Sequence, residues 1–308
     1  MKNKKKLWIT GPNGMVGKSL IKILKNKYKI LSINRQKLDL IDQKKVFQWM
    51  QKNKPDIIIM SAAKVGGIYA NDNFPAEFIY ENLQIQNNII ESARKNKIKK
   101  LIFIGSSCIY PRNCKQPIKE EYLLTGKLED TNQWYAIAKI AGIKMVQSYR
   151  KQYKLNYVSV MPTNMYGPND NYDEKNSHVM AALIRKFCIA KTKNLKKVSV
   201  WGTGKPLREF LFVDDFSNAI LLIIKKYNKD LPINIGSGQE VSILRLANLI
   251  AKILNYKGKI IMDKRYPDGT PRKILDSRKI KKLGWKVKTS LTEGVTKSIS
   301  DYYKRYLY

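Results

Sequence analysis

The sequence contains few of the residues that hold metal ions or form disulfide bonds. Among its 308 residues there are three cysteines and a single histidine, His178. Cys108, Cys114 and Cys188 form no Cys-x-x-Cys pair, and an odd number of cysteines favours free thiols in a reducing compartment. Because a zinc site needs several such ligands close together, we expect no bound metal.

Long hydrophobic runs are also missing. The longest uncharged apolar stretch, residues 219–224, is followed by two lysines, whereas a membrane-spanning helix needs about 20 apolar residues. The basic start of the chain precedes only three apolar residues, 7–9, which is too short for the apolar region of a signal peptide. We therefore expect a soluble cytoplasmic protein without a membrane partner.

Acidic residues are scarce relative to basic ones. The 24 Asp and Glu residues face 59 Lys and Arg residues, which gives a formal charge of +35. Such a charge is typical of proteins that bind nucleic acid or anionic surfaces. However, the lysines are spread over almost every segment, and Lys, Asn, Ile and Tyr are all abundant, as A/T-rich codons would produce. Nucleic-acid binding is therefore the weaker hypothesis, although the charge should attract an anionic nucleotide.

Short apolar runs alternate with longer segments of helical periodicity. This pattern predicts β-α units and a parallel sheet covered on both faces. The expected strands are 7–10, 30–33, 57–60, 101–104, 157–160 and 232–235, and the expected helices are 15–27, 43–52, 75–96, 134–153 and 215–227. The predicted fold class is α/β, a Rossmann-type doubly wound parallel sheet with a smaller C-terminal α/β lobe.

A glycine-rich string follows the first expected strand. Residues 11–17, Gly-Pro-Asn-Gly-Met-Val-Gly, lie where glycines let the backbone turn tightly and approach a pyrophosphate at a helix N-terminus. The second strand is followed by Asn34-Arg35-Gln36-Lys37 instead of the acidic residue that binds the ribose of NAD. These cations favour the 2′-phosphate of NADP, unless Arg35 is only a solvated charge. Asp39 and Leu40 could line the adenine pocket.

The regular alternation loosens after Met161, where proline and glycine interrupt the chain more often. We expect residues 1–163 to form an NADP-binding domain, to which the strand 232–235 returns. Residues 164–308 should form mainly a substrate-binding lobe. No internal repeat or low-complexity linker separates the two.

Tyr135 and Lys139 are four residues apart and should share one face of a helix. The ammonium could then lower the pKa of the phenol from about 10, so that the tyrosine protonates a carbonyl oxygen as hydride arrives. Ser106 follows the fourth strand, at the sheet edge where doubly wound folds bind ligands, and could bind the same oxygen. An exposed helical pair is the alternative interpretation, which the glycine-rich turn and the serine disfavour.

Cys108 lies two residues after Ser106. Free cysteines are more often small buried hydrophobic residues than reactive groups. However, a ketone held by Ser106 and Tyr135 would acidify the hydrogens on both neighbouring carbons, and a thiol partly ionised by Lys139 could remove one. His178 titrates near neutrality and is the candidate for returning a proton from the other side.

These residues together resemble the GDP-L-fucose synthases, bifunctional epimerase-reductases of the extended short-chain dehydrogenase/reductase family. The likeness extends from Gly11 to at least Asp276, and the strings that carry it are 11–17, 62–68, 105–111, 135–142, 161–168, 176–179, 208–210 and 267–273. The resemblance implies that GDP-4-keto-6-deoxy-D-mannose is epimerised at C3 and C5, and that NADPH then reduces its 4-keto group to give GDP-L-fucose. It also implies a homodimer, commonly formed through the helices near 75–96 and 134–153.

The resemblance also implies roles for individual residues. Cys108 would be the base and His178 the acid of epimerisation, while Ser106, Tyr135 and Lys139 would be the reductase triad. NADP would meet Gly11, Pro12, Asn13, Gly14, Met15, Val16, Gly17, Arg35, Gln36, Lys37, Leu38, Asp39, Leu40, Ile104, Gly105, Ser106, Ser107, Lys139, Pro162, Thr163, Asn164, Met165 and His178. The GDP-sugar would meet Lys186, Trp201, Arg208 and Asp268, with Lys273 nearby. The family pattern has arginine at Lys186, and lysine cannot make the same bidentate contact with phosphate, although Arg185 is adjacent.

Several alternatives stay open. A sugar-nucleotide 4,6-dehydratase would have an acidic pair where this chain has Ser107-Cys108, and a simple 4-epimerase would leave Cys108 and His178 without a role. A related epimerase-reductase acting on another 4-keto-deoxy sugar would differ only in pocket shape around one hydroxyl. The alternative from a different class is an RNA-binding protein on a degenerate dehydrogenase fold, which the charge suggests.

Overall fold

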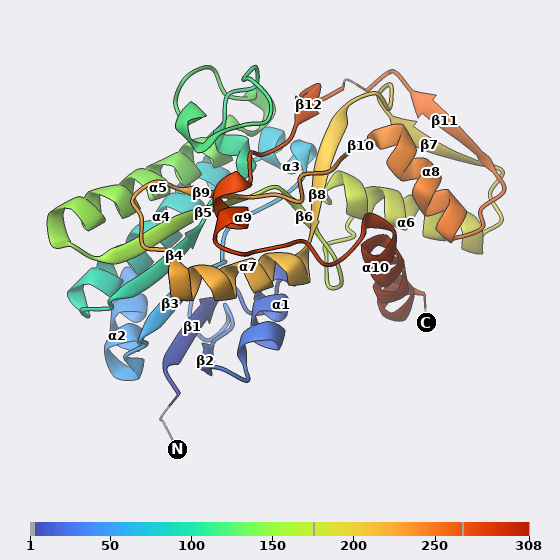
Figure 1. Cartoon of the computed structure of the whole chain (residues 1–308). Coiled ribbons are helices and arrows are strands. Elements are labelled where there is room, and N and C mark those ends of the chain that lie inside the picture. Colours follow the sequence, from blue (N-terminus) through green and yellow to red (C-terminus); the bar gives the residue numbers. More distant parts are fainter. Residues whose placement is uncertain (1–3, 175, 267, 308) are drawn as a thin grey trace.

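The structure is a computed structural model that describes residues 4–174, 176–266 and 268–307. The centre of this described part is a six-stranded parallel sheet in the order β2-β1-β3-β4-β5-β9 (Figure 1). Its strands are β1 (Lys6–Thr10), β2 (Lys29–Ser32), β3 (Ile57–Met60), β4 (Lys100–Ile104), β5 (Asn156–Pro162) and β9 (Ile233–Ile235). The predicted doubly wound α/β fold is confirmed. Because β2 and β3 lie on opposite sides of β1, the strand order reverses there, and ligands of such sheets bind at this switch point.

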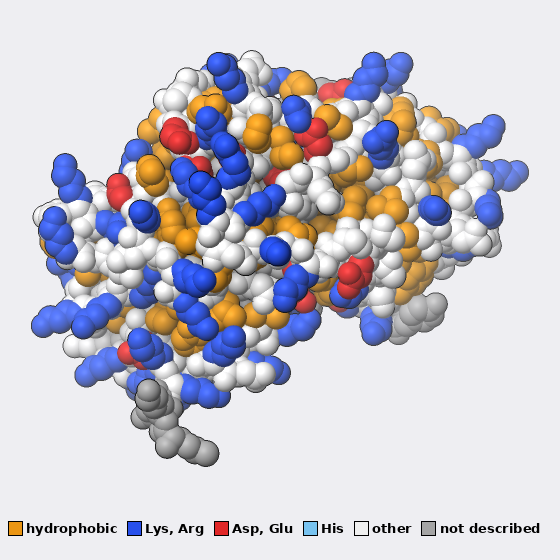
Figure 2. All heavy atoms as spheres, in the orientation of Figure 1, with side chains coloured by type: hydrophobic (Ala, Val, Ile, Leu, Met, Phe, Trp, Pro, Cys, Tyr) orange, Lys and Arg blue, Asp and Glu red, His pale blue; other side chains and the backbone are white. Residues whose placement is uncertain are grey.

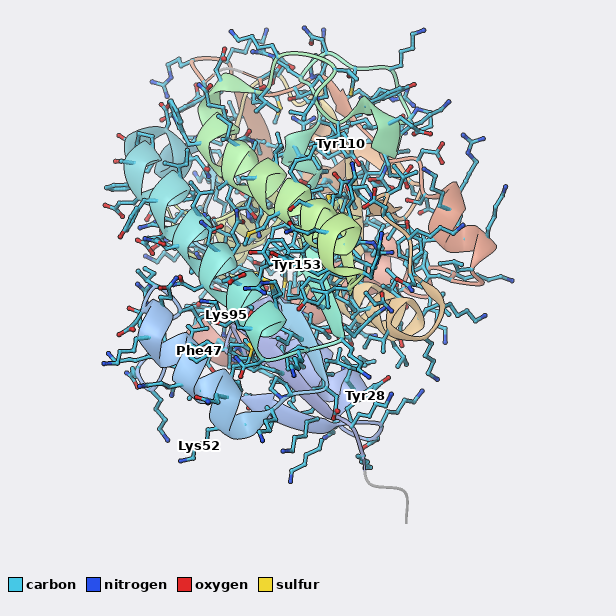
Figure 3. The ribbon with its side chains drawn as sticks, turned by 90° about the vertical axis from the view of Figure 1, so that its left-hand side faces the viewer. Tyr28, Phe47, Lys52, Lys95, Tyr110 and Tyr153 are labelled. Atoms are coloured by element: carbon cyan, nitrogen blue, oxygen red, sulfur yellow. The ribbon has the colours of Figure 1, made fainter. Side chains whose placement is uncertain are left out.

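Helices cover both faces of the sheet, and the alternation of side chains along β1 shows why. Trp8 points into a core formed with α2 (Gln43–Asn53), α4 (Pro75–Lys95) and α5 (Gln133–Tyr153). Leu7 and Ile9 point the other way, into a core formed with α1 (Met15–Leu24) and α7 (Val213–Lys226). Figure 3 shows α2, α4 and α5 together on one face. Strands buried on both faces are apolar at almost every position, as the sequence is here.

The strands and helices expected from the sequence are all present, with ends that differ by a few residues. The largest difference is the first helix, which ends at Leu24 because the N–H groups of Lys27 and Tyr28 bind the Leu24 carbonyl in a closing turn. The fifth strand extends to Pro162. The short helix α3 (Ile68–Asn73) was not expected, since six residues show little periodicity.

The remaining elements enclose a hydrophobic core of their own. Its helices are α6 (Val179–Thr192), α8 (Ile243–Ile253) and α10 (Leu291–Tyr306), and α9 (Arg278–Lys282) contacts β9 instead. β8 (Leu207–Phe212) pairs with β6 (Asn164–Tyr166), β10 (Glu240–Ser242) and β12 (Arg272–Lys273), and β7 (Lys197–Trp201) pairs with β11 (Lys259–Asp263). The domain boundary at residue 163 stays a prediction.

The surface carries cations over the whole face that Figure 2 shows, interrupted by apolar and acidic side chains. Within the described ranges, no helix is both long and apolar enough to cross a lipid bilayer. No three His, Cys, Asp or Glu side chains of these ranges gather as metal ligands would. Pro267, part of one string that carries the resemblance, lies outside the described residues.

Candidate active site

The glycine-rich loop connects β1 to α1 at the carboxyl end of the sheet. Gly11 has φ +66°, which favours glycine, and a Cβ on Gly17 would overlap the Gly11 carbonyl oxygen. Only glycines therefore let α1 begin so close to the loop. Gly14 precedes α1 without a side-chain cap, and the first turn holds no acidic residue. The positive end of the helix dipole and its N–H groups are thus available to a pyrophosphate, so the predicted residues Gly11 to Gly17 fit a dinucleotide.

The turn after β2 presents cations to the solvent. Arg35, Gln36 and Lys37 are exposed, and the Arg35 guanidinium lies 3.7 Å from the Glu81 carboxylate. This single, exposed ion pair leaves the guanidinium free to bind a 2′-phosphate as well.

The rest of this turn is fixed by packing. The Leu38 side chain is 3% exposed and belongs to the core, so this residue can offer a ligand only its backbone. The Asp39 carboxylate accepts the N–H of Ile41 and shapes the turn. Asn88 on α4 donates to the carbonyls of Leu40 and Ile41 over 2.9 and 2.8 Å, an anchor that the sequence alone did not indicate.

The end of β4 brings the predicted triad together. Lys139 on α5 donates to the Ile104 carbonyl over 2.9 Å, and its Nζ lies 5.7 Å from the centre of the Tyr135 ring. Gly105 follows Ile104, where a Cβ would meet the Met161 sulfur at 2.6 Å. Beyond it, the Ser106 hydroxyl accepts the N–H of Cys108 over 3.3 Å, and Ser107 is buried.

Burial shifts the pKa values of Tyr135 and Lys139, and the shift of Tyr135 is opposite to the one expected from the sequence. It raises the pKa of Tyr135 above its usual value, and the neighbouring Cys108 thiolate would raise it further. The expected net lowering of this pKa is wrong, because burial outweighs any attraction by the Lys139 ammonium, which donates to the Ile104 carbonyl and lies over the Tyr135 ring. Burial also lowers the pKa of Lys139 to about 8. Tyr135 is therefore a neutral phenol, a proton donor at neutral pH.

Cys108 is buried, and this burial raises the pKa of its thiol. Several effects oppose the rise in the pKa: the charge of Lys273 first, then a hydrogen bond with Ser106, the charge of Lys139 and a hydrogen bond of the Cys108 backbone. The expected partial ionisation of the thiol by Lys139 is therefore wrong on two points. The thiol is neutral near pH 7, and Lys273 is the cation with the larger effect.

His178 precedes α6 as its N-cap residue, and its position depends on a turn far away in the sequence. The Gly67 N–H donates to the Asn176 carbonyl over 2.9 Å, and a Cβ on Gly67 would lie 2.7 Å from the Ser177 carbonyl oxygen. Only glycine therefore allows this close approach. The imidazole is open to solvent but densely surrounded by protein, and this partial desolvation lowers the pKa of His178.

The same turn connects the His178 segment to the triad. A Cβ on Gly66 would lie 3.2 Å from the Phe78 ring, and Phe78 packs edge-on against Tyr135 with 6.5 Å between ring centroids. The segment that precedes His178 is therefore linked to Tyr135 through Gly67, Gly66 and Phe78. Neither Gly67 nor Phe78 was predicted as a site residue. Gly67 lies in the string 62–68, which is part of the resemblance and could have indicated it.

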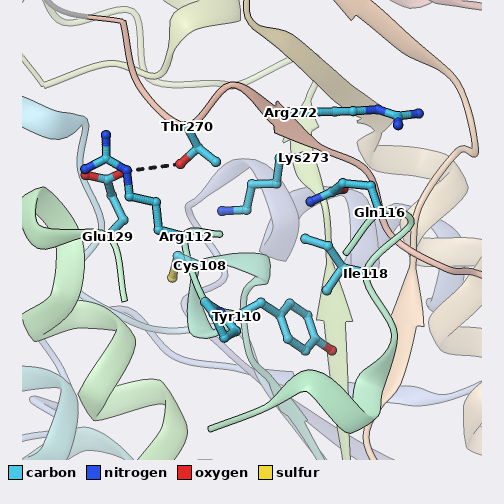
Figure 4. Close-up of a pocket in the computed structure, with 10 residues that line it drawn as sticks. Cys108, Tyr110, Arg112, Gln116, Ile118, Glu129, Thr270, Arg272 and Lys273 are labelled. Atoms are coloured by element: carbon cyan, nitrogen blue, oxygen red, sulfur yellow. Dashed lines mark hydrogen bonds and ion pairs between the residues drawn. The ribbon is translucent and has the colours of Figure 1, made fainter. Parts of the chain in front are cut away.

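A pocket opens beside Cys108, between the loop after β4 and the strand β12 (Figure 4). Its lining consists of Cys108, Tyr110, Pro111, Arg112, Gln116, Ile118, Glu129, Thr270, Arg272 and Lys273. A second hollow adjoins it and shares Pro111 and Arg112. The predicted base thus lies in a concave site next to the predicted substrate residue Lys273.

Trp201, at the end of β7, contacts an ammonium and a phenol. The Lys186 Nζ is 4.9 Å from the Trp201 ring, and Tyr266 stacks on this ring with 4.2 Å between centroids and 13° between planes. The two rings remain 52% and 42% exposed. Tyr266 was not predicted, since it lies in a loop without periodicity. Arg185 forms an ion pair with Glu174 over 3.0 Å, so it does not replace Lys186 beside the ring.

Asp268 closes the loop after β7. Its carboxylate accepts the N–H and the hydroxyl of Thr203 over 2.9 and 2.6 Å, and these bonds lower the pKa of Asp268. Gly202, with φ +80°, is the position where any Cβ would overlap the Asp268 carboxylate. Burial lowers the pKa of Arg208, and the negative charge of Asp268 opposes this lowering more strongly than that of Glu129 does.

These contacts arrange the predicted substrate residues in a row. Gly202 follows Trp201 in the chain and lies against the Asp268 carboxylate. Arg208 on β8 pairs with Lys273 on β12. Lys273 shares its pocket with Cys108. The row therefore begins at an exposed aromatic ring, continues through cations, and ends beside the triad.

Glu209 forms hydrogen bonds with both the predicted cofactor segment and the segment that follows β12. The string 208–210 had suggested a role only for Arg208. Its side chain is 0% exposed, and its carboxylate accepts the N–H groups of Gly238 and Leu275 over 2.6 and 3.0 Å. Its carbonyl accepts the Thr163 hydroxyl and the Asn164 carboxamide over 3.2 and 2.9 Å. Glu209 thus fixes the predicted cofactor segment Pro162 to Met165 relative to the segment that carries Lys273.

Residues 7–236 match the NAD dependent epimerase/dehydratase family. The chain belongs to this family. A GDP-L-fucose synthase of Sinorhizobium fredii is 50% identical to it over 299 residues, which cover 97% of this chain and 95% of that protein. The resemblance to GDP-L-fucose synthases is confirmed.

Solved structures of family members superpose over the whole chain. A GDP-L-fucose synthetase from Naegleria fowleri bound to NADP has a TM-score of 0.92 at 27% identity, and the match covers 100% of this chain and 96% of that one. A GDP-6-OMe-4-keto-L-xylo-heptose reductase from C. jejuni has a TM-score of 0.91 at 34% identity, with 99% of each chain covered. Both names thus describe enzymes of GDP-sugars, and one of the two structures has NADP bound.

Proposed function

We propose that this protein is an NADPH-dependent enzyme that epimerises GDP-4-keto-6-deoxy-D-mannose at C3 and C5 and reduces it to GDP-L-fucose. The observation that carries the proposal is the meeting of two chemistries at one strand end. Ser106, Tyr135 and Lys139 suit a ketone reductase, and the Cys108 thiol opens into a pocket beside them. The 50% identity to a GDP-L-fucose synthase supports the same activity.

The loop Gly11 to Gly17 would bind the cofactor pyrophosphate, and Arg35 its 2′-phosphate. NADPH, when bound, supplies hydride to C4 of the sugar. The Ser106 hydroxyl and the neutral Tyr135 phenol hold the ketone oxygen, and the phenol donates its proton as negative charge develops there. The Lys139 ammonium, fixed by the Ile104 carbonyl, stabilises the phenolate that remains.

The same ketone makes epimerisation possible. Hydrogen bonds to its oxygen acidify the hydrogens on C3 and C5, because the carbanion that forms is an enolate held by Ser106 and Tyr135. Cys108, as a thiolate, removes the proton from one face. His178, approaching from the segment docked on Gly67, returns a proton to the opposite face and inverts the carbon.

Residues 164–308 would bind the GDP portion. The Trp201 ring offers a stacking surface to guanine, while Lys186 and Arg208 offer positive charge to the diphosphate. Asp268 would accept hydrogen bonds from the nucleoside. On the face that Figure 2 shows, lysines and arginines are scattered and form no stripe for nucleic acid, which supports a role of the charge in attracting this anionic substrate.

The assembly expected for this enzyme is a cytoplasmic homodimer. The neighbouring helices α4 and α5 expose large apolar side chains, among them Tyr80, Ile137 and Tyr153. Figure 3 labels Tyr153 on this layer. A surface of this kind on two packed helices supports a four-helix contact between two copies.

The activity is tested by mixing the protein with GDP-4-keto-6-deoxy-D-mannose and NADPH in deuterated water. We expect loss of NADPH absorbance and deuterium at C3 and C5 of a product that is GDP-L-fucose. NADPH oxidation without deuterium at these carbons would instead identify a plain reductase, the activity named for the C. jejuni structure. Salt-dependent RNA binding without NADPH oxidation would refute both.

A further inference from the structure

Lys273 reaches the pocket beside Cys108 because of the register of a two-residue strand. β12 pairs in parallel with β8, which fixes Lys273 opposite Arg208. The neighbouring Arg272 is exposed and bound by the Glu240 carboxylate over 2.8 Å. In Figure 4 the Lys273 amine points into the pocket on the side of Cys108, whereas the Arg272 guanidinium points away from it. Of these two cations, only Lys273 can act on the thiol.

The Lys273 ammonium lacks a counter-ion in the free protein. Among the residues that the structure describes, no hydrogen bond or ion pair reaches its Nζ. The charged or titratable groups around it are Cys108, Cys114, Arg208 and Glu129. Arg208 repels it, and Glu129 is already engaged by Arg112 over 3.4 Å and by the Thr270 hydroxyl over 3.1 Å. The Lys273 side chain is half-buried, and a cation partly withdrawn from water favours an anion beside it.

Two of these neighbours can become that anion, and both are thiols. Burial lowers the pKa of Lys273, and the charge of Cys108 is the first of the effects that raise it again. In the other direction, Lys273 is the first of the groups that counter the rise in the Cys108 pKa. The pair is therefore coupled in both directions. Besides Lys273, the groups facing the thiol are Ser106, Lys139 and Tyr135.

We propose that Lys273 is the cation that stabilises the thiolate form of Cys108, the base of epimerisation, an inference that rests on the proposed function. Lys139 is less suited to this role, because its ammonium is committed to the Ile104 carbonyl and lies over the rings of Tyr135 and Phe103. Each reactive group thus has its own lysine. Lys139 serves the phenol that reduces, and Lys273 serves the thiol that exchanges protons.

Each proton that moves in this step has a donor and an acceptor. The Cys108 thiol first loses its proton to water while Lys273 stays charged. The thiolate then takes the proton from carbon, and the electron pair of the C–H bond moves to the ketone oxygen held by Ser106 and Tyr135. His178 gives its proton to the opposite face of the carbon, and water restores the charge states of both residues.

The test measures the reactivity of Cys108 directly, without substrate. The intact protein is treated with iodoacetamide, a neutral reagent, between about pH 6 and 10, and carbamidomethylation of Cys108 is followed by peptide mass spectrometry. Lys273→Met should slow the labelling of Cys108 at pH 8 about tenfold and shift its pH profile to higher pH. Lys273→Arg should keep most of the reactivity, which excludes a misfolded pocket as the cause.

Two comparisons are built into the same samples. Arg272→Met removes a cation from the same strand and should leave the labelling of Cys108 unchanged. Cys188, which is buried in the other core, should stay unlabelled in every folded variant, so its labelling reports loss of structure. Cys114 is unsuitable for that purpose, because Lys273 also lowers its pKa.

An unchanged pH profile of Cys108 in Lys273→Met would overturn the proposal. If this variant then had only a raised KM for the GDP-sugar, Lys273 would be a phosphate contact. Failure of the proposed function would look different. It would leave the unsubstituted enzyme without deuterium at C3 and C5, whatever the labelling of its thiol.

Discussion

The reductive group and the proton-exchange group share one ketone but are built in different ways. Ser106, Tyr135 and Lys139 lie on the end of β4 and on α5, which pack against each other in one core. The cation proposed for Cys108 lies on β12 and the proposed partner histidine precedes α6, and each of these positions depends on a contact between distant segments. The two activities should therefore respond differently to substitution. We expect the reductive group to tolerate changes outside the central sheet better than the proton-exchange group does.

Tyr135→Phe should separate the two groups most strongly. Loss of the phenol removes the proton donor to the ketone oxygen and should slow NADPH oxidation about 10²- to 10⁴-fold. Deuterium should still enter C3 and C5, since Ser106 continues to polarise the ketone. NADPH absorbance and the isotope content of the recovered sugar give the two rates. Equal losses of both would contradict the division between the groups.

Cys108→Ser should have the converse effect. The alcohol is a far weaker base than a thiolate, so deuterium exchange at C3 and C5 should fall about 10²-fold or more. Oxidation of GDP-L-fucose by NADP⁺ needs only the reductive group and should keep most of its rate. Its loss in this variant would show that the thiol also takes part in hydride transfer.

Gly67→Ala tests the contact that positions His178. The added Cβ would lie 2.7 Å from the Ser177 carbonyl oxygen and must displace the segment leading to the histidine. Because catalytic groups must hold their positions closely, we expect a loss of about ten- to 100-fold in exchange. Oxidation of GDP-L-fucose serves as the control and should change less. The reverse ranking would place His178 in the reductive step.

The pH dependence should distinguish the groups by smaller factors. The pKa of Cys108 is raised and that of His178 is lowered, so the thiolate fraction grows while the imidazolium fraction falls as pH rises, and the exchange rate should change little between the two pKa values. The pKa of Lys139 is lowered to about 8, so its ammonium is lost above about pH 8 and hydride transfer should decline there. Exchange is measured with NADP⁺, and reduction in single turnovers on sugar epimerised beforehand by Tyr135→Phe. Parallel profiles would contradict this assignment.

Much of the reductive group could be predicted because its signals are local. Strand and helix periodicity, the glycine-rich turn and the spacing of Tyr135 and Lys139 each lie within a short stretch of sequence. The proton-exchange group was predicted less completely. The role of Lys273 depends on the pairing of β12 with β8, and that of Gly67 on the docking of residues 176–177. The predicted pKa shifts of Cys108 and Tyr135 were wrong, because burial, which the sequence does not show, outweighs the effect of the neighbouring charges.

Proton exchange at C3 and C5 should use the ketone without needing hydride transfer. To check this, the enzyme is incubated with GDP-4-keto-6-deoxy-D-mannose and NADP⁺, in place of NADPH, in deuterated water. We expect deuterium to enter C3 and C5 while the 4-keto group persists. Deuterium that appears at these carbons only when NADPH is supplied would contradict this expectation.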